Sequence, residues 1–305
     1  MNNKYSNLYI KFLQKFIDIK KPIRVVFDCF NGSTGPVLSQ LFKTHKFLTN
    51  KLINSRPDGR FPGHGPNPLL KGKMRQLKKE VIKSKADLGV AFDADGDRAF
   101  FIDNLGRPLP SYLMAYLLFL FLRPPFVVDN LIFESLKSCG FLEQNKRKIF
   151  ISAVGSYFVK KLMRRKSADF GAEYSGHYYF KISDSGRGIL SSSPNKSEFY
   201  FDSGILATIK ALNAVSRLPY SLADFYDLSP EFYLQEKDIK TINPKESLRI
   251  LFQKYGPKAK RIKKGDGLTF YFEKAWLNIR PSNTEPILRC VAASQNKKSL
   301  KSINE

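Results

Sequence analysis

The strongest chemical signal in the sequence is the segment Asp93-Ala94-Asp95-Gly96-Asp97-Arg98. Three carboxylates at such short spacing repel one another unless a cation neutralises them. Carboxylate oxygens are hard ligands that suit Mg²⁺ or Ca²⁺, and three of them leave open positions that Mg²⁺ commonly fills with water and substrate phosphate. We therefore predict a magnesium site formed by Asp93, Asp95 and Asp97.

Two other interpretations compete with a magnesium site in this segment. An EF-hand requires Gly at its sixth position and a bidentate Glu at its twelfth, where this chain has Arg98 and Asn104. The apolar runs on either side, Leu88–Phe92 and Ala99–Ile102, also predict strands rather than helices. An exposed acidic turn stays open as an alternative, because Asp-Gly pairs are common in turns.

A second segment, residues 280–286, carries hydrogen-bond donors suited to an anion. It reads Arg-Pro-Ser-Asn-Thr-Glu-Pro and stands between two predicted strands. One guanidinium, two hydroxyls and one amide, together with the backbone N–H groups of the loop, match the needs of a phosphate dianion. A polar turn between strands is the alternative.

Two further segments carry weaker signals. Glu173, Ser175 and His177 lie on a glycine-flanked stretch, where their side chains could accept from or donate to sugar hydroxyls. Lys160 follows Gly155 in the first turns of a predicted helix, among many surface lysines. On their own, a lone histidine and a surface lysine are more often structural than catalytic.

The elements that must position these segments alternate along the chain. Short β-branched runs predict strands at Ile23–Phe27, Leu88–Phe92, Phe126–Val128 and Ile149–Ser152. Helical spacing predicts helices at Leu8–Ile17, Val37–Phe42, Leu69–Lys85, Tyr112–Leu122, Phe133–Cys139, Ser156–Arg165 and Asp202–Val215. This alternation predicts two α/β domains, the second with a largely parallel sheet. The remainder, with strands at Gly267–Phe272, Ala275–Ile279 and Ile287–Ala292, predicts a smaller α+β domain.

The composition limits the class of protein. The chain has 305 residues and a formal charge of +24, from 51 Lys and Arg against 27 Asp and Glu. Such an excess raises the possibility of a nucleic-acid partner. The Lys and Arg residues are scattered, however, and no nucleic-acid-binding motif accompanies them, so nucleic-acid binding stays the least favoured alternative. The longest apolar run, Tyr112–Leu122, is too short to span a membrane. With no secretory signal and three widely spaced cysteines, we predict a cytoplasmic protein.

Taken in order, these segments resemble the α-D-phosphohexomutases, the phosphomannomutase/phosphoglucomutase family. DADGDR resembles the metal loop of that family, GAEYSGH its sugar-specificity loop and RPSNTEP its phosphate-binding loop. Three more stretches support the resemblance: VVFDCFNGSTG, RPDGRFPGHGPNP and DSGILATIKAL. The resemblance implies two α/β domains with mixed sheets (residues 1–106 and 107–222, domains II and III) and a smaller C-terminal α+β domain IV (residues 223–305).

The resemblance also implies roles for individual residues. Mg²⁺ is expected at the three aspartates, Arg98 at the transferring phosphoryl group, and Lys160 in proton transfer. Glu173, Ser175 and His177 are expected to hold the sugar hydroxyls. The phosphate that does not react is expected to contact Arg280, Ser282, Asn283 and Thr284. The implied reaction interconverts hexose 1-phosphate and 6-phosphate by way of a phosphoserine, across a cleft between the acidic loop and the phosphate-binding loop.

Two departures from the family pattern limit these expectations. Ser156 stands where the family usually has His, which weakens the proton-transfer role of this segment. The family's first domain carries a phosphoserine loop similar to Thr/Ser-Ala-Ser-His-Asn-Pro, and residues 1–305 contain no such motif. We therefore expect a truncated mutase that a separate phosphoserine domain completes in trans, or a sugar-phosphate-binding fragment without turnover. The identity of the hexose stays open.

Overall fold

The computed structural model describes residues 4–43, 45–145, 148–183, 198–282 and 285–304. The chain divides into two compact units, one formed by Met1–Ile132 with Arg147–Leu228 and the other by Phe133–Lys146 with Ser229–Glu305. Across the described ranges, no helix combines the length and the apolar character needed to cross a membrane. The domain boundaries 1–106, 107–222 and 223–305 stay a prediction.

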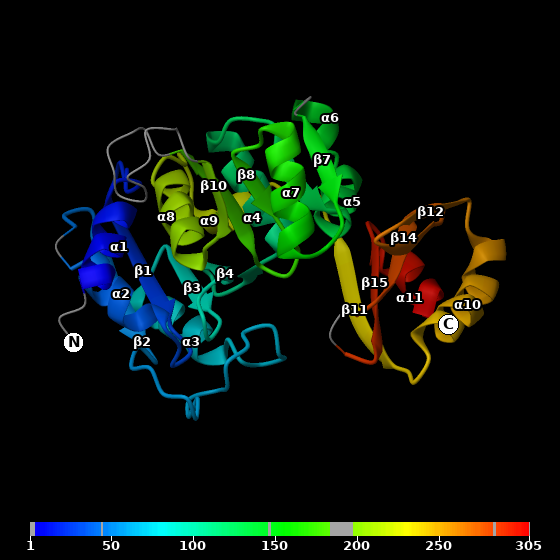
Figure 1. Cartoon of the computed structure of the whole chain (residues 1–305), viewed down its shortest axis with the longest axis horizontal. Coiled ribbons are helices and arrows are strands. Elements are labelled where there is room, and N and C mark those ends of the chain that lie inside the picture. The colour runs from blue at the N-terminus through cyan, green and yellow to red at the C-terminus, as the bar shows by residue number, and fades with distance from the viewer. Residues whose placement is uncertain (1–3, 44, 146–147, 184–197, 283–284, 305) are drawn as a thin grey trace. The chain divides into compact units, whose positions relative to one another are not determined.

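The first sheet of the first unit has the strand order β2-β1-β3-β4-β5. Figure 1 labels its strands β1 to β4. Its strands are β1 (Ile23–Asp28), β2 (Leu48–Ile53), β3 (Leu88–Phe92), β4 (Ala99–Asp103) and β5 (Pro108–Leu109). Strand β1 pairs in parallel with β2 and β3, whereas the β3–β4 and β4–β5 pairs are antiparallel. The helices before and between these strands are α1 (Lys4–Gln14), α2 (Thr34–Leu41) and α3 (Arg75–Ser84).

The second sheet of this unit has the order β10-β9-β8-β6-β7. Its strands are β6 (Phe126–Asp129), β7 (Ile149–Ser152), β8 (Phe170–Ala172), β9 (Tyr178–Ser183) and β10 (Glu198–Asp202). The pairs of β6 with β7 and β8 are parallel, and those of β9 with β8 and β10 are antiparallel. The sheet is therefore mixed, as the resemblance implied, and less parallel than the alternation alone suggested.

The helices in this part of the chain that belong wholly or partly to the first unit are α4 (Ser111–Phe121), α5 (Asn130–Ser138), α7 (Ser156–Lys166), α8 (Gly204–Val215) and α9 (Leu222–Asp227). Helix α4 is the longest apolar run of the sequence, and Leu113, Met114 and Leu117 on it are fully buried. It packs against α8, so its apolar character serves a protein core. Helix α5 passes from the first unit into the second.

The second unit is built on one antiparallel sheet in the order β11-β15-β14-β13-β12. Its strands are β11 (Tyr233–Lys240), β12 (Arg261–Gly265), β13 (Gly267–Tyr271), β14 (Ala275–Pro281) and β15 (Ile287–Ser294). Its helical segments are α6 (Phe141–Asn145), α10 (Pro244–Tyr255), η1 (Gly256–Lys258) and α11 (Lys297–Asn304). Phe270, Leu277 and Leu288 lie in its core with Leu300 of α11.

The predicted fold class is confirmed: two α/β parts with mixed sheets are followed by a smaller α+β part. The predicted helix over Leu69–Lys85 is too long, because α3 begins only at Arg75. Gly72 has φ 83°, which no right-handed helix accommodates, so residues 69–74 form turns. Leu69 and Leu70 are exposed there and contribute nothing to the core.

Candidate active site

The segment with the three aspartates is the turn that joins β3 to the antiparallel β4. Asp93 is 2% exposed, and its Oδ1 accepts hydrogen bonds from the backbone N–H groups of Gly96 and Arg98, both at 3.2 Å. Its Oδ2 accepts from Arg98 Nε at 2.5 Å. Gly96 has φ 78°, a conformation that favours glycine. Asp93 therefore stabilises the turn through the hydrogen bonds that its buried carboxylate accepts.

The carboxylates of Asp93, Asp95 and Asp97 converge, with one oxygen of each within 4.8 Å of the others. Burial and the neighbouring carboxylates raise the pKa of Asp97 to about 6, against the opposing effect of His177. Asp97 Oδ1 is enclosed and has no hydrogen-bond partner among the described residues. Crowded carboxylates with an unused oxygen fit a hard divalent cation, which would relieve their repulsion.

The loop between β1 and α2 holds the aspartate turn in place. The Ser33 N–H donates to Ala94 O at 2.8 Å, and Ser33 Oγ donates to Asp95 O at 2.8 Å. A Cβ atom on Gly32 would lie 2.3 Å from Ala94 O, so this close approach requires glycine. The stretch Asn31-Gly32-Ser33 thus supports the backbone that carries the aspartates.

Residues 173–177 form a tight turn between β8 and β9. Glu173 and His177 close it with a backbone hydrogen bond from Glu173 N to His177 O of 2.9 Å. Ala99 N donates to Gly176 O at 3.1 Å, and Arg98 forms an isolated antiparallel bridge with His177. Backbone contacts therefore join the aspartate turn to the 173–177 turn.

The side chain of Glu173 is almost fully enclosed. The residue is 2% exposed, its Oε1 accepts from Gly155 N at 2.6 Å, and its Oε2 accepts from the Tyr179 hydroxyl. Glu173 thus links the 173–177 turn to the start of α7, the helix that carries Lys160. Ser175 is half-buried, and its hydroxyl has no hydrogen-bond partner within the part of the chain that the structure describes.

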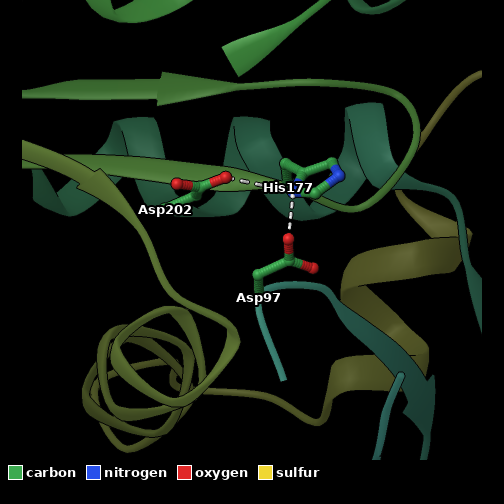
Figure 2. Close-up of side chains that lie close together, drawn as sticks. All are labelled: Asp97, His177 and Asp202. Carbon is green, nitrogen blue, oxygen red and sulfur yellow. Dashed lines mark ion pairs between the residues drawn. The ribbon is translucent and has the colours of Figure 1, made fainter. Parts of the chain in front are cut away.

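His177 lies between two carboxylates (Figure 2). Its Nδ1 is 3.4 Å from Asp202 Oδ2 and 3.6 Å from Asp97 Oδ2. Burial alone would lower the pKa of His177, but the carboxylates of Asp202, Asp97 and Glu173 outweigh it and raise the pKa. Lys160 Nζ is 3.5 Å from the other oxygen of Asp202. The imidazole, the lysine and the aspartate turn therefore belong to one cluster of charged groups.

Sequence reasoning missed three members of this site. Asp202 and Ser33 lie inside the stretches DSGILATIKAL and VVFDCFNGSTG, which resemble the family without indicating a role for either residue, and Tyr179 lies outside all the predicted segments. Asp202 had no usable signal, because the strand that it ends, β10, mixes polar and apolar residues and was not predicted. No signal in the sequence indicated the contact of Tyr179 with Glu173, because this contact depends on how the chain turns between β8 and β9.

The predicted phosphate-binding segment lies in the second unit, at the end of β14. Arg280 Nε is 3.9 Å from Asp266 Oδ2, and Ser282 N donates to Ile287 O at 3.0 Å. A Cβ atom on Gly267 would lie 2.6 Å from Arg280 Cβ, so glycine there makes room for the arginine. Asn283 and Thr284 lie outside the described residues.

Comparison with known proteins agrees with this architecture. Residues 7–106 match the phosphoglucomutase/phosphomannomutase α/β/α domain II, residues 135–232 match α/β/α domain III, and residues 231–305 match the C-terminal domain of the same family. The chain therefore belongs to the phosphoglucomutase/phosphomannomutase family.

Individual relatives are similar over most of this chain. It is 30% identical to a phosphomannomutase of Methanocaldococcus jannaschii, over 91% of this chain and 59% of the relative. It is 29% identical to a phosphomannomutase of Escherichia coli, over 92% of this chain and 61% of the relative. A crystal structure of a phosphoglucomutase/phosphomannomutase family protein from Burkholderia thailandensis has the same fold, with a TM-score of 0.77, 21% identity, and coverage of 98% of this chain and 62% of the other. The chain thus spans about 60% of the length of these relatives.

Proposed function

We propose that this chain is part of a phosphohexomutase that interconverts hexose 1-phosphate and hexose 6-phosphate. The observation that carries the proposal is the junction of the aspartate turn with the 173–177 turn, through Ala99 N and Gly176 O and through the Arg98–His177 bridge. This junction brings groups suited to a metal-bound phosphoryl group next to groups suited to a sugar. The relatives named as phosphomannomutases support the same activity.

Asp93, Asp95 and Asp97 would hold Mg²⁺. When bound, this ion neutralises the charge that develops on the oxygens of a transferring phosphoryl group. Arg98 lies beside the trio, with its Nε 3.8 Å from Asp97 Oδ1, and would share in that neutralisation. Ser33 would keep the aspartate turn in position during transfer, because it is hydrogen-bonded to the turn's backbone.

Glu173, Ser175 and His177 would bind the sugar. Each carboxylate oxygen of Glu173 has lone pairs beyond the one it already uses. Because the residue is 2% exposed, a sugar hydroxyl would reach it only if the 173–177 turn shifts. His177 directs Nδ1 toward Asp202 and Asp97, which leaves Nε2 to take the proton from the hydroxyl that attacks phosphorus. Lys160, paired with Asp202, would add positive charge close to this step.

Arg280, Ser282, Asn283 and Thr284 of the second unit would bind the phosphate that does not react. A guanidinium can contact phosphate oxygens in a bidentate manner, and its present partner, Asp266 at 3.9 Å, is too distant for a hydrogen bond. Arg280 is thus available for a stronger anionic partner.

The reaction also needs a phosphoserine donor, which we propose comes from a separate domain in trans. A cytoplasmic location, where hexose phosphates are metabolised, would suit this scheme.

The decisive experiment is an assay of mannose 1-phosphate and glucose 1-phosphate isomerisation with Mg²⁺, with and without the phosphorylated first domain of a relative. The proposal predicts turnover only when both parts are present, and loss of turnover in Asp95→Asn. The same first domain mixed with the relative's own remaining domains is the positive control. Hexose-phosphate binding without turnover, when that control is active, would favour a binding fragment. Salt-sensitive binding of RNA or DNA that Asp95→Asn leaves unchanged would favour the nucleic-acid alternative.

A further inference from the structure

A second set of metal-ligand groups lies next to the aspartate trio. It consists of Asp97, His177 and Asp202, and one ligand atom of each lies within 4.8 Å of the others. The three residues come from the β3–β4 turn, the β8–β9 turn and the end of β10. Figure 2 shows both carboxylates directed toward the imidazole. Because three separate elements supply the ligands, the fold holds them together.

Two of the three distances in this set are close to those between neighbouring ligand atoms of a metal ion. Zinc bonds of about 2.0–2.2 Å in a tetrahedral arrangement place neighbouring ligand atoms roughly 3.3–3.6 Å apart. The distances from His177 Nδ1 are 3.4 Å to Asp202 Oδ2 and 3.6 Å to Asp97 Oδ2. A charge-assisted hydrogen bond would be shorter, at about 2.7–2.9 Å.

The ligand atoms of this set are not engaged in strong hydrogen bonds with other described groups. His177 Nδ1 is enclosed and forms no hydrogen bond with any residue that the structure describes. Asp202 directs Oδ1 toward Lys160 at 3.5 Å, which leaves Oδ2 for the side of the imidazole. Asp97 can contribute one oxygen here and the other to the trio.

We propose that Asp97, His177 and Asp202 form a second cation site, which shares Asp97 with the aspartate trio and takes a borderline first-row cation such as Zn²⁺. An imidazole nitrogen with two carboxylates suits Zn²⁺, Co²⁺ or Ni²⁺, whereas Mg²⁺ prefers oxygen ligands alone. Since both sites use Asp97, occupation of one changes the affinity of the other.

The site has a consequence that rests on the proposed function. A cation on Nδ1 fixes the proton of the imidazole on Nε2. His177 can then no longer accept a proton from a sugar hydroxyl. Zn²⁺ bound here is therefore an inhibitor of the transfer reaction, by a route separate from displacement of Mg²⁺ at the trio.

The test is a titration of the metal-free chain with Co²⁺, whose visible absorption reports nitrogen and oxygen ligands, followed by displacement with Zn²⁺. We expect one ion bound, released by one equivalent of Zn²⁺. His177→Gln and Asp202→Asn should each weaken Co²⁺ binding by at least about tenfold. Asp95→Asn, which removes a ligand of the trio only, should weaken Mg²⁺ binding and leave Co²⁺ binding within a few-fold of the native chain.

The matched control is His64→Gln, because His64 also pairs with an aspartate, Asp28, at 3.0 Å. Its Co²⁺ affinity should equal that of the native chain. Equal Co²⁺ affinity in His177→Gln and the native chain would overturn the proposal and leave His177 as an imidazolium between two carboxylates. A greater loss in Asp95→Asn than in His177→Gln would overturn it too, since the ion would then sit in the trio. Neither result depends on mutase activity, so the proposed function and this site can fail separately.

Discussion

Tyr179 donates its hydroxyl hydrogen to Oε2 of Glu173, and both residues are buried next to the cluster of charged groups. The contact lies inside the first unit and joins β9 to the turn that precedes it. It leaves Glu173 with one donor on each carboxylate oxygen, the Tyr179 hydroxyl and the N–H of Gly155.

Replacing Tyr179 with Phe should weaken sugar-phosphate binding. The substitution keeps the ring but leaves a buried carboxylate oxygen without its donor, at a cost of about 1–3 kcal/mol in folding stability. Glu173 then holds the 173–177 turn less firmly, so the affinity for the sugar phosphate should fall several-fold. Isothermal titration with mannose 1-phosphate measures the affinity. Tyr157→Phe is the control, because Tyr157 is 65% exposed. If Tyr179→Phe lowers the free energy of unfolding but leaves the affinity unchanged, Tyr179 serves stability alone.

Replacing Ser33 with Ala should weaken Mg²⁺ binding. The change removes the hydrogen bond from Ser33 Oγ to Asp95 O, worth about 1 kcal/mol, and loosens the aspartate turn. Ser39→Ala is a close control, because Ser39 Oγ also donates to a backbone carbonyl, that of Pro36, away from the turn. We expect a several-fold loss of Mg²⁺ affinity for Ser33→Ala only, measured by calorimetry. An equal effect of both substitutions would argue against a specific role for Ser33.

Replacing Gly204 with Ala should disrupt the site from the side of α8. A Cβ atom there would lie 2.6 Å from Arg98 O and 2.8 Å from Gly96 O, so the aspartate turn must shift. Overpacking of this kind costs about 1–3 kcal/mol. Urea unfolding and Mg²⁺ titration should both show the loss. Gly59→Ala is the control and should lose neither stability nor Mg²⁺ affinity, because the added atom meets nothing within 4 Å. A native Mg²⁺ affinity in Gly204→Ala would show that the aspartate turn does not depend on its close contact with Gly204.

His64 should make stability depend on pH. Burial lowers the pKa of His64, but its contact with the carboxylate of Asp28 outweighs this and raises the pKa above its usual value. A raised pKa means that the folded state binds the proton more tightly, so this contribution to stability is complete below about pH 6.5 and is lost as the pH rises through the folded-state pKa. The difference in unfolding free energy between the native chain and His64→Gln should therefore shrink from pH 5.5 to pH 8.5. If this difference grows from pH 5.5 to pH 8.5 instead, the protonated form of His64 does not stabilise the folded state and the prediction is wrong.

The order of elements could be predicted from the sequence because strands and helices alternate with clear periods. Leu88–Phe92 and Ser156 onward, for example, stand where β3 and α7 are found. The strand β2 and the hairpin of β9 and β10 were not predicted. The runs Leu48–Ile53 and Glu198–Asp202 mix polar and apolar residues, and only their pairing with β1 and β9 makes them strands.

The candidate site could be predicted only as separate pieces. The type and spacing of Asp93, Asp95 and Asp97 indicated a cation, and their oxygens do converge. Nothing in the sequence indicated that His177 would face Asp97 and Asp202, because the three are far apart along the chain and meet only when two sheets fold together. Spacing reveals local chemistry, whereas pairing across elements needs the fold.

The central claim is that the aspartate trio and the 173–177 turn act on the same phosphorylated hexose. The most direct measurement is the ³¹P NMR line width of mannose 1-phosphate bound to this chain, with Mn²⁺ in place of Mg²⁺. A paramagnetic ion at the trio should strongly broaden the phosphorus line, EDTA should reverse the broadening, and Asp95→Asn should remove most of it. Mannose 1-phosphate that binds with an unbroadened phosphorus line, or that does not bind, would contradict the claim.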